Sequence, residues 1–221
     1  VISLPTFDCS HIGENNIDVT VSDVNGNETN EAVVITIVDY ETPVLSVQDF
    51  NLELDENGQA ELHKTDVVVS AADNCELDTT LSQSVFTCAD IGINNIDITV
   101  SDNHGNVVTE QANITVEDLL APELTAQDIT IELDDNSYAE ISPDMVVLTA
   151  FDNCALSDTS LSQSVFYTED IGNATVDVTL TDESGNSTTL PITVTVLEII
   201  PPEIVTQSID VYLDETGNSF V

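Results

Sequence analysis

IGINNIDITVSDNHGN, residues 91–106, has the pattern of a tight corner, an alternating strand and a Gly-Asn turn that starts a returning strand. Nearly the same string occurs upstream at residues 12–27 and downstream at residues 171–186. Corresponding glycines, at positions 13, 92 and 172, are separated by 79 residues (92 − 13) and 80 residues (172 − 92). A period of this size is long enough for a small domain with its own core, so the sequence predicts a tandem array of domains.

The remaining pattern within each repeat consists of short strands separated by turn residues. Residues 50–55 alternate apolar and polar side chains, and the same alternation returns at residues 129–134 and 209–214. Short strands at this spacing, without a sustained helical period, are typical of a β-sandwich. We therefore expect an all-β protein of tandem immunoglobulin-like antiparallel β-sandwich domains in an elongated array.

The repeat phase predicts how the chain divides into domains. Residues 1–42 are expected to form the C-terminal half of a repeat, 43–121 and 122–201 complete repeats, and 202–221 the start of a further one. Such a phase predicts a segment of a longer protein. Each junction contains proline, at Pro43, Pro122 and Pro202, and proline restricts the backbone, so we expect stiff joints and a semi-rigid rod.

The net charge of −41 comes from 42 acidic residues and a single basic one, Lys64. Binding to nucleic acid requires basic side chains that neutralise phosphates, and this chain lacks them. An anionic membrane surface is disfavoured as a partner for the same reason, and we expect no direct membrane insertion of this segment. The apolar fraction of 41% is strictly patterned, so the chain can bury a core despite its acidity. Salt or divalent cations screen such self-repulsion, which favours an extracellular location.

Several short motifs together resemble a known repeat type. They are Asp73-Asn74-Cys75, the stretch 86–92 around Cys88, the Ser101-Asp102 and Gly105-Asn106 pairs, and the closing Val116-Glu117-Asp118. This set is similar to hyalin-type (HYR-like) immunoglobulin repeats of large surface adhesins of Bacteroidota, including SprB-type gliding adhesins. The resemblance implies cell-surface display through type IX secretion, outer-membrane attachment through other parts of the parent protein, and a role in attachment or gliding motility.

The cysteines suggest one disulfide within the second repeat. A Cys75–Cys88 bridge would close a loop of about 14 residues and stabilise the fold by roughly 3 kcal/mol; free buried thiols are the alternative. In the third repeat Cys154 matches Cys75, but Thr168 replaces the second cysteine, so Cys154 is expected to be an unpaired thiol. The partner of Cys9 is expected before residue 1. Zinc is improbable because no repeat offers four Cys and His ligands.

Calcium is the metal that the acidic loops favour. The series Asp23, Asn25, Asn27 has alternating oxygen ligands, but Gly26 precedes the third ligand, which rejects an EF-hand loop. An Asx-rich hairpin turn is the simpler interpretation of these loops. Domain junctions are better candidates, because loops from one repeat should meet the exit of the preceding one. The candidate calcium ligands are Asp39, Glu41, Asp73, Asn74 and Asp102 at one junction, and Glu117, Asp118, Asp152, Asn153 and Asp182 at the next. Solvated acidity with a monovalent ion cloud is the alternative.

No residue pattern points to catalysis. The three histidines are not equivalent between repeats, and there is no nucleophile motif, phosphate loop or dinucleotide fingerprint. Asp78-Thr79-Thr80 resembles the Bacteroidota O-glycosylation motif, which makes Thr79 a candidate glycosylation site.

The sequence therefore predicts a non-enzymatic spacer of a very long extracellular adhesin, whose partners are neighbouring repeats of the same chain and an extracellular polysaccharide or surface protein. One alternative is a calcium-dependent carbohydrate- or protein-binding module. Low aromatic content and the absence of tryptophan favour the spacer. The other alternative is an accessory array of a secreted polysaccharide-degrading enzyme, which only sequence outside residues 1–221 would reveal.

Overall fold

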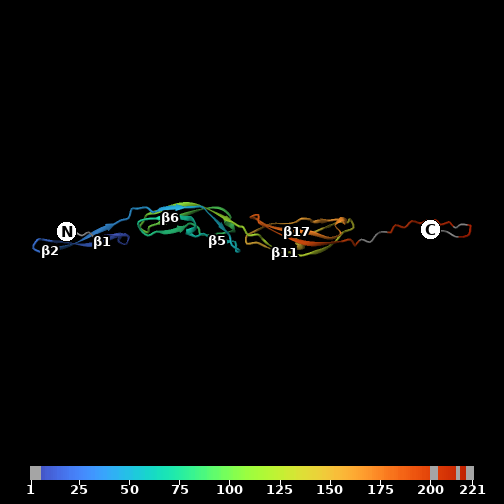
Figure 1. Cartoon of the computed structure of the whole chain (residues 1–221), viewed down its shortest axis with the longest axis horizontal. Helices are drawn as coiled ribbons and strands as arrows, with labels where there is room; N and C mark the ends of the chain where they lie inside the picture. The colour runs from blue at the N-terminus through green and yellow to red at the C-terminus, as the bar shows by residue number, and fades with distance from the viewer. Residues whose placement is uncertain (1–5, 200–203, 213–214, 218–221) are drawn as a thin grey trace. The chain divides into compact units, whose positions relative to one another are not determined.

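The computed structural model describes residues 6–199, 204–212 and 215–217, and its β-strands and few single helical turns lie between Cys9 and Leu197 (Figure 1). The chain divides into two compact units. The first comprises Val1–Glu123, Phe151–Asp158 and Thr181–Ser187, and the second Leu124–Ala150, Thr159–Leu180 and Thr188–Val221. Two loops of the third repeat thus belong to the first unit. The repeat boundaries inferred from the sequence stay a prediction.

The first unit begins with a two-stranded hairpin. A 3₁₀ turn, η1 (Cys9–His11), leads into β1 (Gly13–Ser22), which pairs antiparallel with β2 (Glu28–Ile37), Gly13 opposite Ile37. Apolar side chains on this hairpin are only partly covered: Val21 is 66% exposed, whereas its counterpart Val100 in the second repeat is fully buried. The hairpin is therefore a sheet with one layer among the described residues.

The second repeat completes the first unit as a two-layered sandwich. Its elements are β3 (Val44–Val47), β4 (Phe50–Glu53), β5 (Gln59–Glu61), α1 (Lys64–Val67), β6 (Val68–Ala72), β7 (Asp78–Leu81), β8 (Val85–Thr87), η2 (Cys88–Asp90), β9 (Gly92–Ser101) and β10 (Val107–Glu117). One sheet has the order β4-β10-β9-β7, and the pairs β3-β6 and β5-β8 form the remainder. β4 runs parallel to β10, and the other pairs are antiparallel.

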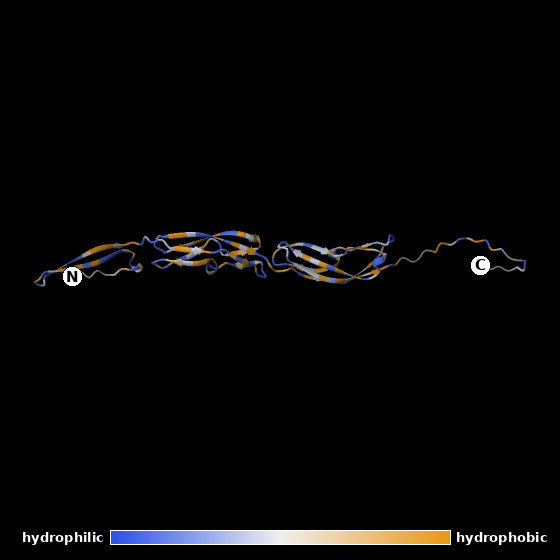
Figure 2. Ribbon diagram, turned by 45° about the horizontal axis from the view of Figure 1, so that its top comes forward, coloured by the Kyte–Doolittle hydropathy of each residue, from blue (hydrophilic) through white to orange (hydrophobic). Residues whose placement is uncertain are grey.

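Alternation along these strands places the core between the layers. Ile96 and Ile98 of β9 and Ile114 of β10 are at most 2% exposed, and Phe86 of β8 packs into the same cluster with no exposed surface. Figure 2 shows this as hydrophobic and hydrophilic colours that alternate along the strands. Fully burying side chains of this size stabilises the fold by about 1.5–3 kcal/mol each.

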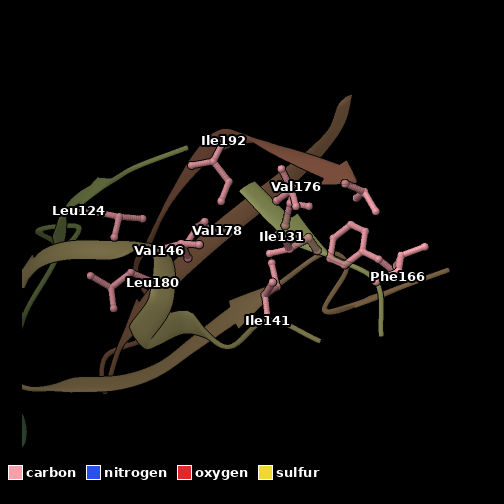
Figure 3. Close-up of a cluster of buried hydrophobic side chains, with 12 residues drawn as sticks. Leu124, Ile131, Ile141, Val146, Phe166, Val176, Val178, Leu180 and Ile192 are labelled. Atoms are coloured by element: carbon pink, nitrogen blue, oxygen red, sulfur yellow. The ribbon is translucent and has the colours of Figure 1, made fainter. Parts of the chain in front are cut away.

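The third repeat has the same architecture. Its elements are β11 (Glu123–Ala126), β12 (Ile129–Glu132), β13 (Ala139–Glu140), α2 (Pro143–Val146), β14 (Val147–Phe151), β15 (Leu156–Leu161), β16 (Val165–Phe166), η3 (Thr168–Asp170), β17 (Gly172–Asp182) and β18 (Ser187–Leu197). The main sheet has the order β12-β18-β17-β15, with β11-β14 and β13-β16 as pairs. Its core is a cluster of buried side chains that includes Val176 and Val178 of β17, with Phe166 toward one end and Leu124 toward the other (Figure 3).

The predicted fold class is confirmed: the domains are all-β immunoglobulin-like sandwiches. The closing hairpin expected at residues 96–117 is β9 paired with β10. The run of valines at residues 67–69 divides between α1, which ends at Val67, and β6, which begins at Val68. A second single helical turn is α2, with Pro143 in its first turn. Residues 213–214 of the last alternating run lie outside the described residues.

Candidate functional site

Two disulfides, both within the first compact unit, connect consecutive repeats. Cys9 of η1 is bonded to Cys75, which follows β6, with a Cα–Cα distance of 5.7 Å. Cys88 of η2 is bonded to Cys154, which follows β14, at a Cα–Cα distance of 5.6 Å. Each bond spans 66 residues of sequence. No free cysteine is present in the described chain.

The Cys75–Cys88 bridge predicted from the sequence is wrong, and so are the free thiol at Cys154 and the partner of Cys9 before residue 1. Cys75 lies near the end of β9, where Asp78 pairs with Ser101, whereas Cys88 lies just before the start of β9. A ten-residue strand is about 30 Å long, and a disulfide requires Cα atoms within about 7 Å. The signal available in the sequence was the identical spacing between the two true pairs, which the repeat-by-repeat comparison missed.

The Cys88–Cys154 disulfide packs against a tight turn after β4. Gly58 has a φ of 68°, and a Cβ atom placed there would lie 2.5 Å from Cys88 Sγ and 2.6 Å from the carbonyl oxygen of Asn153. The left-handed backbone favours glycine here, and the close approach of Cys88 and of the next repeat's loop leaves no room for a side chain. Cys88 and Cys154 also pack against the apolar core of this unit.

The first acidic cluster consists of Asp39, Asp73 and Asp102, whose carboxylate oxygens lie within 4.8 Å of one another. They follow the ends of β2, β6 and β9, so three strand ends converge on one point. Asp102 is fully buried. Asp39 Oδ2 and Asp73 Oδ1 are buried oxygens without a hydrogen-bond partner in the described residues. Carboxylates packed this closely repel one another unless a cation lies among them.

The second acidic cluster repeats this arrangement with Asp118, Asp152 and Asp182, again within 4.8 Å. They lie at or just after the ends of β10, β14 and β17, and Asp118 and Asp182 are 4% and 2% exposed. Asp118 Oδ1 accepts a hydrogen bond from Asn153 Nδ2 at 3.1 Å, and its Oδ2 accepts one from Ser184 Oγ at 3.3 Å. Asn153 Oδ1 is buried without a partner in the part of the chain that the structure describes.

The electrostatics of the two clusters differ. Burial raises the pKa of Asp152, the backbone N–H of Cys154 partly offsets this, and the neighbouring carboxylates of Asp118 and Asp182 raise it further. Burial also raises the pKa of Asp102, but hydrogen bonds from Asn106 and nearby backbone amides outweigh it and hold that pKa below its ordinary value. Repulsion between the carboxylates of the second cluster therefore raises the pKa of Asp152.

The remaining predicted ligands lie around the clusters and not within them. Asn74 Nδ2 donates to Asp39 Oδ1 at 3.2 Å, and Asn153 holds Asp118 as described. Glu41 is exposed beyond the first cluster. Glu117 is the last residue of β10, and its carbonyl oxygen accepts a hydrogen bond from the backbone N–H of Leu54.

Two asparagines that the ligand prediction omitted orient these clusters. Asn106 Nδ2 donates to Asp102 Oδ2 and to the carbonyl oxygen of Asp39. Asn186 Nδ2 donates to Asp182 Oδ2 at 2.8 Å and to the carbonyl oxygen of Asp118 at 3.0 Å. The signal in the sequence is the recurring Asp-x-x-x-Asn spacing at the hairpin turns, which by itself indicates only an Asx-rich turn.

Other groups near the clusters have simpler roles. His104 lies within ligand distance of Asp39 and Cys75, but the sulfur of Cys75 is committed to a disulfide and cannot bind a metal. The Asp23 loop forms an Asx turn, in which Asp23 Oδ1 accepts hydrogen bonds from the backbone N–H groups of Asn25 and Asn27. Thr79 is half-buried on the edge strand β7, and its glycosylation stays a prediction.

A solvent-open hollow lies beside the second cluster. It has a volume of about 500 Å³ and is lined by Glu56, Asn57, Leu120, Ala121, Glu123, Phe151, Asp152 and Asn153. Phe151 is 62% exposed, and the corresponding residue of the second repeat is Ala72. The aromatic surface is therefore not a shared feature of these two repeats.

Comparison with protein-family models and with curated proteins finds no match. Solved structures with some likeness include immunoglobulin domains 1–4 of Sidekick-1, with a TM-score of 0.38 and 11% identity, covering 83% of this chain and 58% of that one. The first two extracellular cadherin domains of human mucin-like protocadherin give 0.34 and 14%, covering 70% and 98%. Domains 3–6 of protocadherin gammaB7 give 0.37 and 14%, covering 86% and 60%. At such scores these likenesses carry no argument about function. Within the described residues, no helix is long and apolar enough to cross a membrane.

Proposed function

We propose that this chain is a non-enzymatic spacer segment of a long extracellular adhesin, with successive repeats joined by disulfides and by calcium. The observation that carries the proposal is the pair of disulfides, each joining one repeat to the next. Disulfides persist in oxidising, extracytoplasmic surroundings. The resemblance to HYR-like repeats supports surface display and a role in attachment or gliding. In this role the partners of each repeat are its neighbours, and an extracellular polysaccharide or surface protein would be bound elsewhere in the parent protein.

The two acidic clusters fit calcium by their donor chemistry. Both trios offer only carboxylate oxygens, surrounded by asparagine amides and backbone carbonyls, and calcium takes six to eight oxygen ligands. The orphaned oxygens of Asp39, Asp73 and Asn153 are groups that a cation would satisfy. Asp39, Asp73 and Asp102 would hold one ion, and Asp118, Asp152 and Asp182 the other. A bound cation would neutralise the repulsion within each trio and hold the converging strand ends together.

Calorimetric titration and thermal unfolding of the whole chain test this proposal. We expect binding of two calcium ions and a higher melting temperature in calcium than in EDTA. Asp118→Asn should abolish one of the two binding events. Glu110→Gln, an exposed position on β10 with no role in either trio, is the matched control and should bind two ions. Absence of binding heat together with an unchanged melting temperature would remove calcium and leave a plain acidic spacer.

The hollow lined by the exposed ring of Phe151 favours a second candidate function, a calcium-dependent binding module for carbohydrate or protein. A glycan array probed with the intact chain separates the two functions. A spacer should bind no glycan with or without calcium. Calcium-dependent binding that Phe151→Ala abolishes would favour the binding module instead.

A further inference from the structure

Most of the chain from Cys9 to Cys154 lies inside two closed covalent loops. One disulfide closes residues 9–75 into a ring, and the other closes residues 88–154. We propose that these bonds act as force shunts: tension along the chain passes from Cys9 to Cys75 and from Cys88 to Cys154, and the residues between carry none of it. This proposal rests on the spacer role proposed above, because a spacer of an adhesin is the part of the protein that bears tension.

The first ring contains a sheet that a second layer does not cover among the described residues. The hairpin of β1 and β2 has a single layer and exposes apolar side chains such as Val21. A sheet of two strands is marginally stable alone, and tension applied directly to it would separate its strands. Because both strands lie between Cys9 and Cys75, the disulfide transmits the load past them.

The proline-containing junctions are also relieved of tension. Residues 39–43 lie within the first ring and residues 118–122 within the second. The backbone that leaves Asp39 or Asp118 therefore does not bear load, although both residues belong to the acidic clusters. A calcium ion bound at each acidic cluster would fix the orientation of neighbouring repeats, whereas the disulfide beside it would bear the tension.

Load in the second repeat falls on the short segment between Cys75 and Cys88. It contains β7, which pairs with β9 of the second ring, and β8, which pairs with β5 of the first ring. Further hydrogen bonds hold it: Ser82 N–H donates to the Asp97 carbonyl at 3.0 Å, and Leu62 N–H donates to the Ser84 carbonyl at 2.7 Å. The loaded segment is thus clamped between two rings that cannot lengthen.

The third repeat lacks this protection over most of its length. Thr168 occupies the position of Cys88, so no further bridge starts from η3. In its main sheet only β12 lies inside the second ring, and β15, β17 and β18 follow Cys154. Under tension, β18 would be pulled from its neighbours, and this repeat should unfold before the segment between Cys75 and Cys88 extends in the oxidised chain.

The shunts make a quantitative prediction about length. Each bridge removes 66 residues from the extensible contour. At about 3.3–3.6 Å per extended residue, each corresponds to roughly 220–240 Å of hidden length. Breaking both bridges should therefore add about 450 Å to the fully extended chain.

Single-molecule force extension of the full chain, held at its two ends, tests the shunt. Addition of dithiothreitol, which reduces each disulfide to two thiols, should raise the maximum extension by about 450 Å. The Cys88→Ser/Cys154→Ser variant should release half of this gain before reductant and half after it. Cys9→Ser/Cys75→Ser is the matched control and should behave alike, because its ring has the same length. Reduction of the wild-type chain while it is tethered avoids any dependence on the folding of the variants.

Two outcomes would overturn the proposal. Equal extension with and without reductant would show that no bridge shields the chain. A gain of only about 45 Å would indicate a Cys75–Cys88 bridge within one repeat. Either result is independent of calcium, because the extension is measured in EDTA. A chain that binds no calcium but shows the full gain would keep the shunt and remove the metal from the proposed function.

Discussion

The second and third repeats share their strand pattern, and two of the positions at which their sequences differ are in contact with each other in the second repeat. Gly58 lies in the turn after β4 and touches Cys88, whereas the corresponding residues of the third repeat are Ser137 and Thr168. Both turn residues have a positive φ, 68° for Gly58 and 58° for Ser137. The backbone alone therefore does not demand glycine. The additional requirement at Gly58 is the disulfide and the loop of the next repeat against it.

Two requirements therefore act on this residue: the turn needs a left-handed backbone in both repeats, and the disulfide-linked joint needs the absence of a side chain in the second repeat. A left-handed residue suits the turn in either repeat, and serine tolerates it at a cost of about 1–2 kcal/mol. In the second repeat, Gly58 is followed thirty residues later by Cys88, which forms the disulfide with Cys154 of the following repeat. We expect the same pair to indicate linked joints in other repeats of this type, and its absence to indicate joints without a disulfide.

Removal of a bridge should have the largest effect on stability. The Cys88→Ser/Cys154→Ser variant should lose about 4 kcal/mol of unfolding free energy in the chain-entropy model, because the ring is long. Cys9→Ser/Cys75→Ser should lose a similar amount, since both bonds span 66 residues. Denaturant unfolding followed by circular dichroism measures both variants. A much smaller loss for either pair would mean that the ring is already restricted in the unfolded chain.

Substitution of the turn glycine should come next. Gly58→Ala should cost about 2–4 kcal/mol, from the left-handed backbone and from overlap with Cys88 Sγ and the Asn153 carbonyl. Ser137→Gly, which relieves the same left-handed backbone in the repeat that has Thr168 in place of the cysteine, is the control and should raise stability by about 1–2 kcal/mol. The melting temperatures of both variants measure the two changes. A loss in Gly58→Ala no larger than the gain in Ser137→Gly would show that backbone conformation, and not the joint, selects glycine.

The acidic clusters should respond to pH with opposite signs. The pKa of Asp152 is raised in the folded chain, so its contribution to stability is full below the ordinary value and is lost as pH rises through the raised pKa. In EDTA, Asp152→Asn should therefore raise the melting temperature slightly at pH 7 and leave it unchanged at pH 3. The pKa of Asp102 is lowered, so its contribution is present at neutral pH and disappears as pH falls through the lowered pKa. Asp102→Asn should lower the melting temperature at pH 7, and matching signs for both variants would contradict this account.

Introduction of the missing cysteine should have the smallest effect. Thr168 is exposed on η3, so Thr168→Cys should alter stability by less than about 0.5 kcal/mol. Thiol titration should find one reactive group, compared with none in the parent chain. Failure to detect a thiol would mean that a disulfide has formed between two chains, because five cysteines cannot all pair within one chain.

Much of the fold could be predicted because it depends on local periodicity. Ile96, Ile98 and Val100 alternate with polar residues, and this alternation alone places them in the core, where all three are found. Asp39, Asp73 and Asp102 could be brought together from the sequence because loops at one end of such a sandwich converge. The supporting amides of Asn106 and Asn186 could not, since their direction depends on side-chain rotamers within the turn.

Sequence by itself determined the repeat, the strand pattern, the buried faces and the aspartates at the junctions, because each follows from spacing along a strand or from position relative to a turn. Only the tertiary structure decided the partners of the four cysteines. Cys75 and Cys88 are close in sequence but lie near opposite ends of β9, while Cys88 and Cys154 are far apart in sequence and in contact in space. A disulfide forms between neighbours in three dimensions, and a rigid strand between two residues keeps them apart however short the sequence between them.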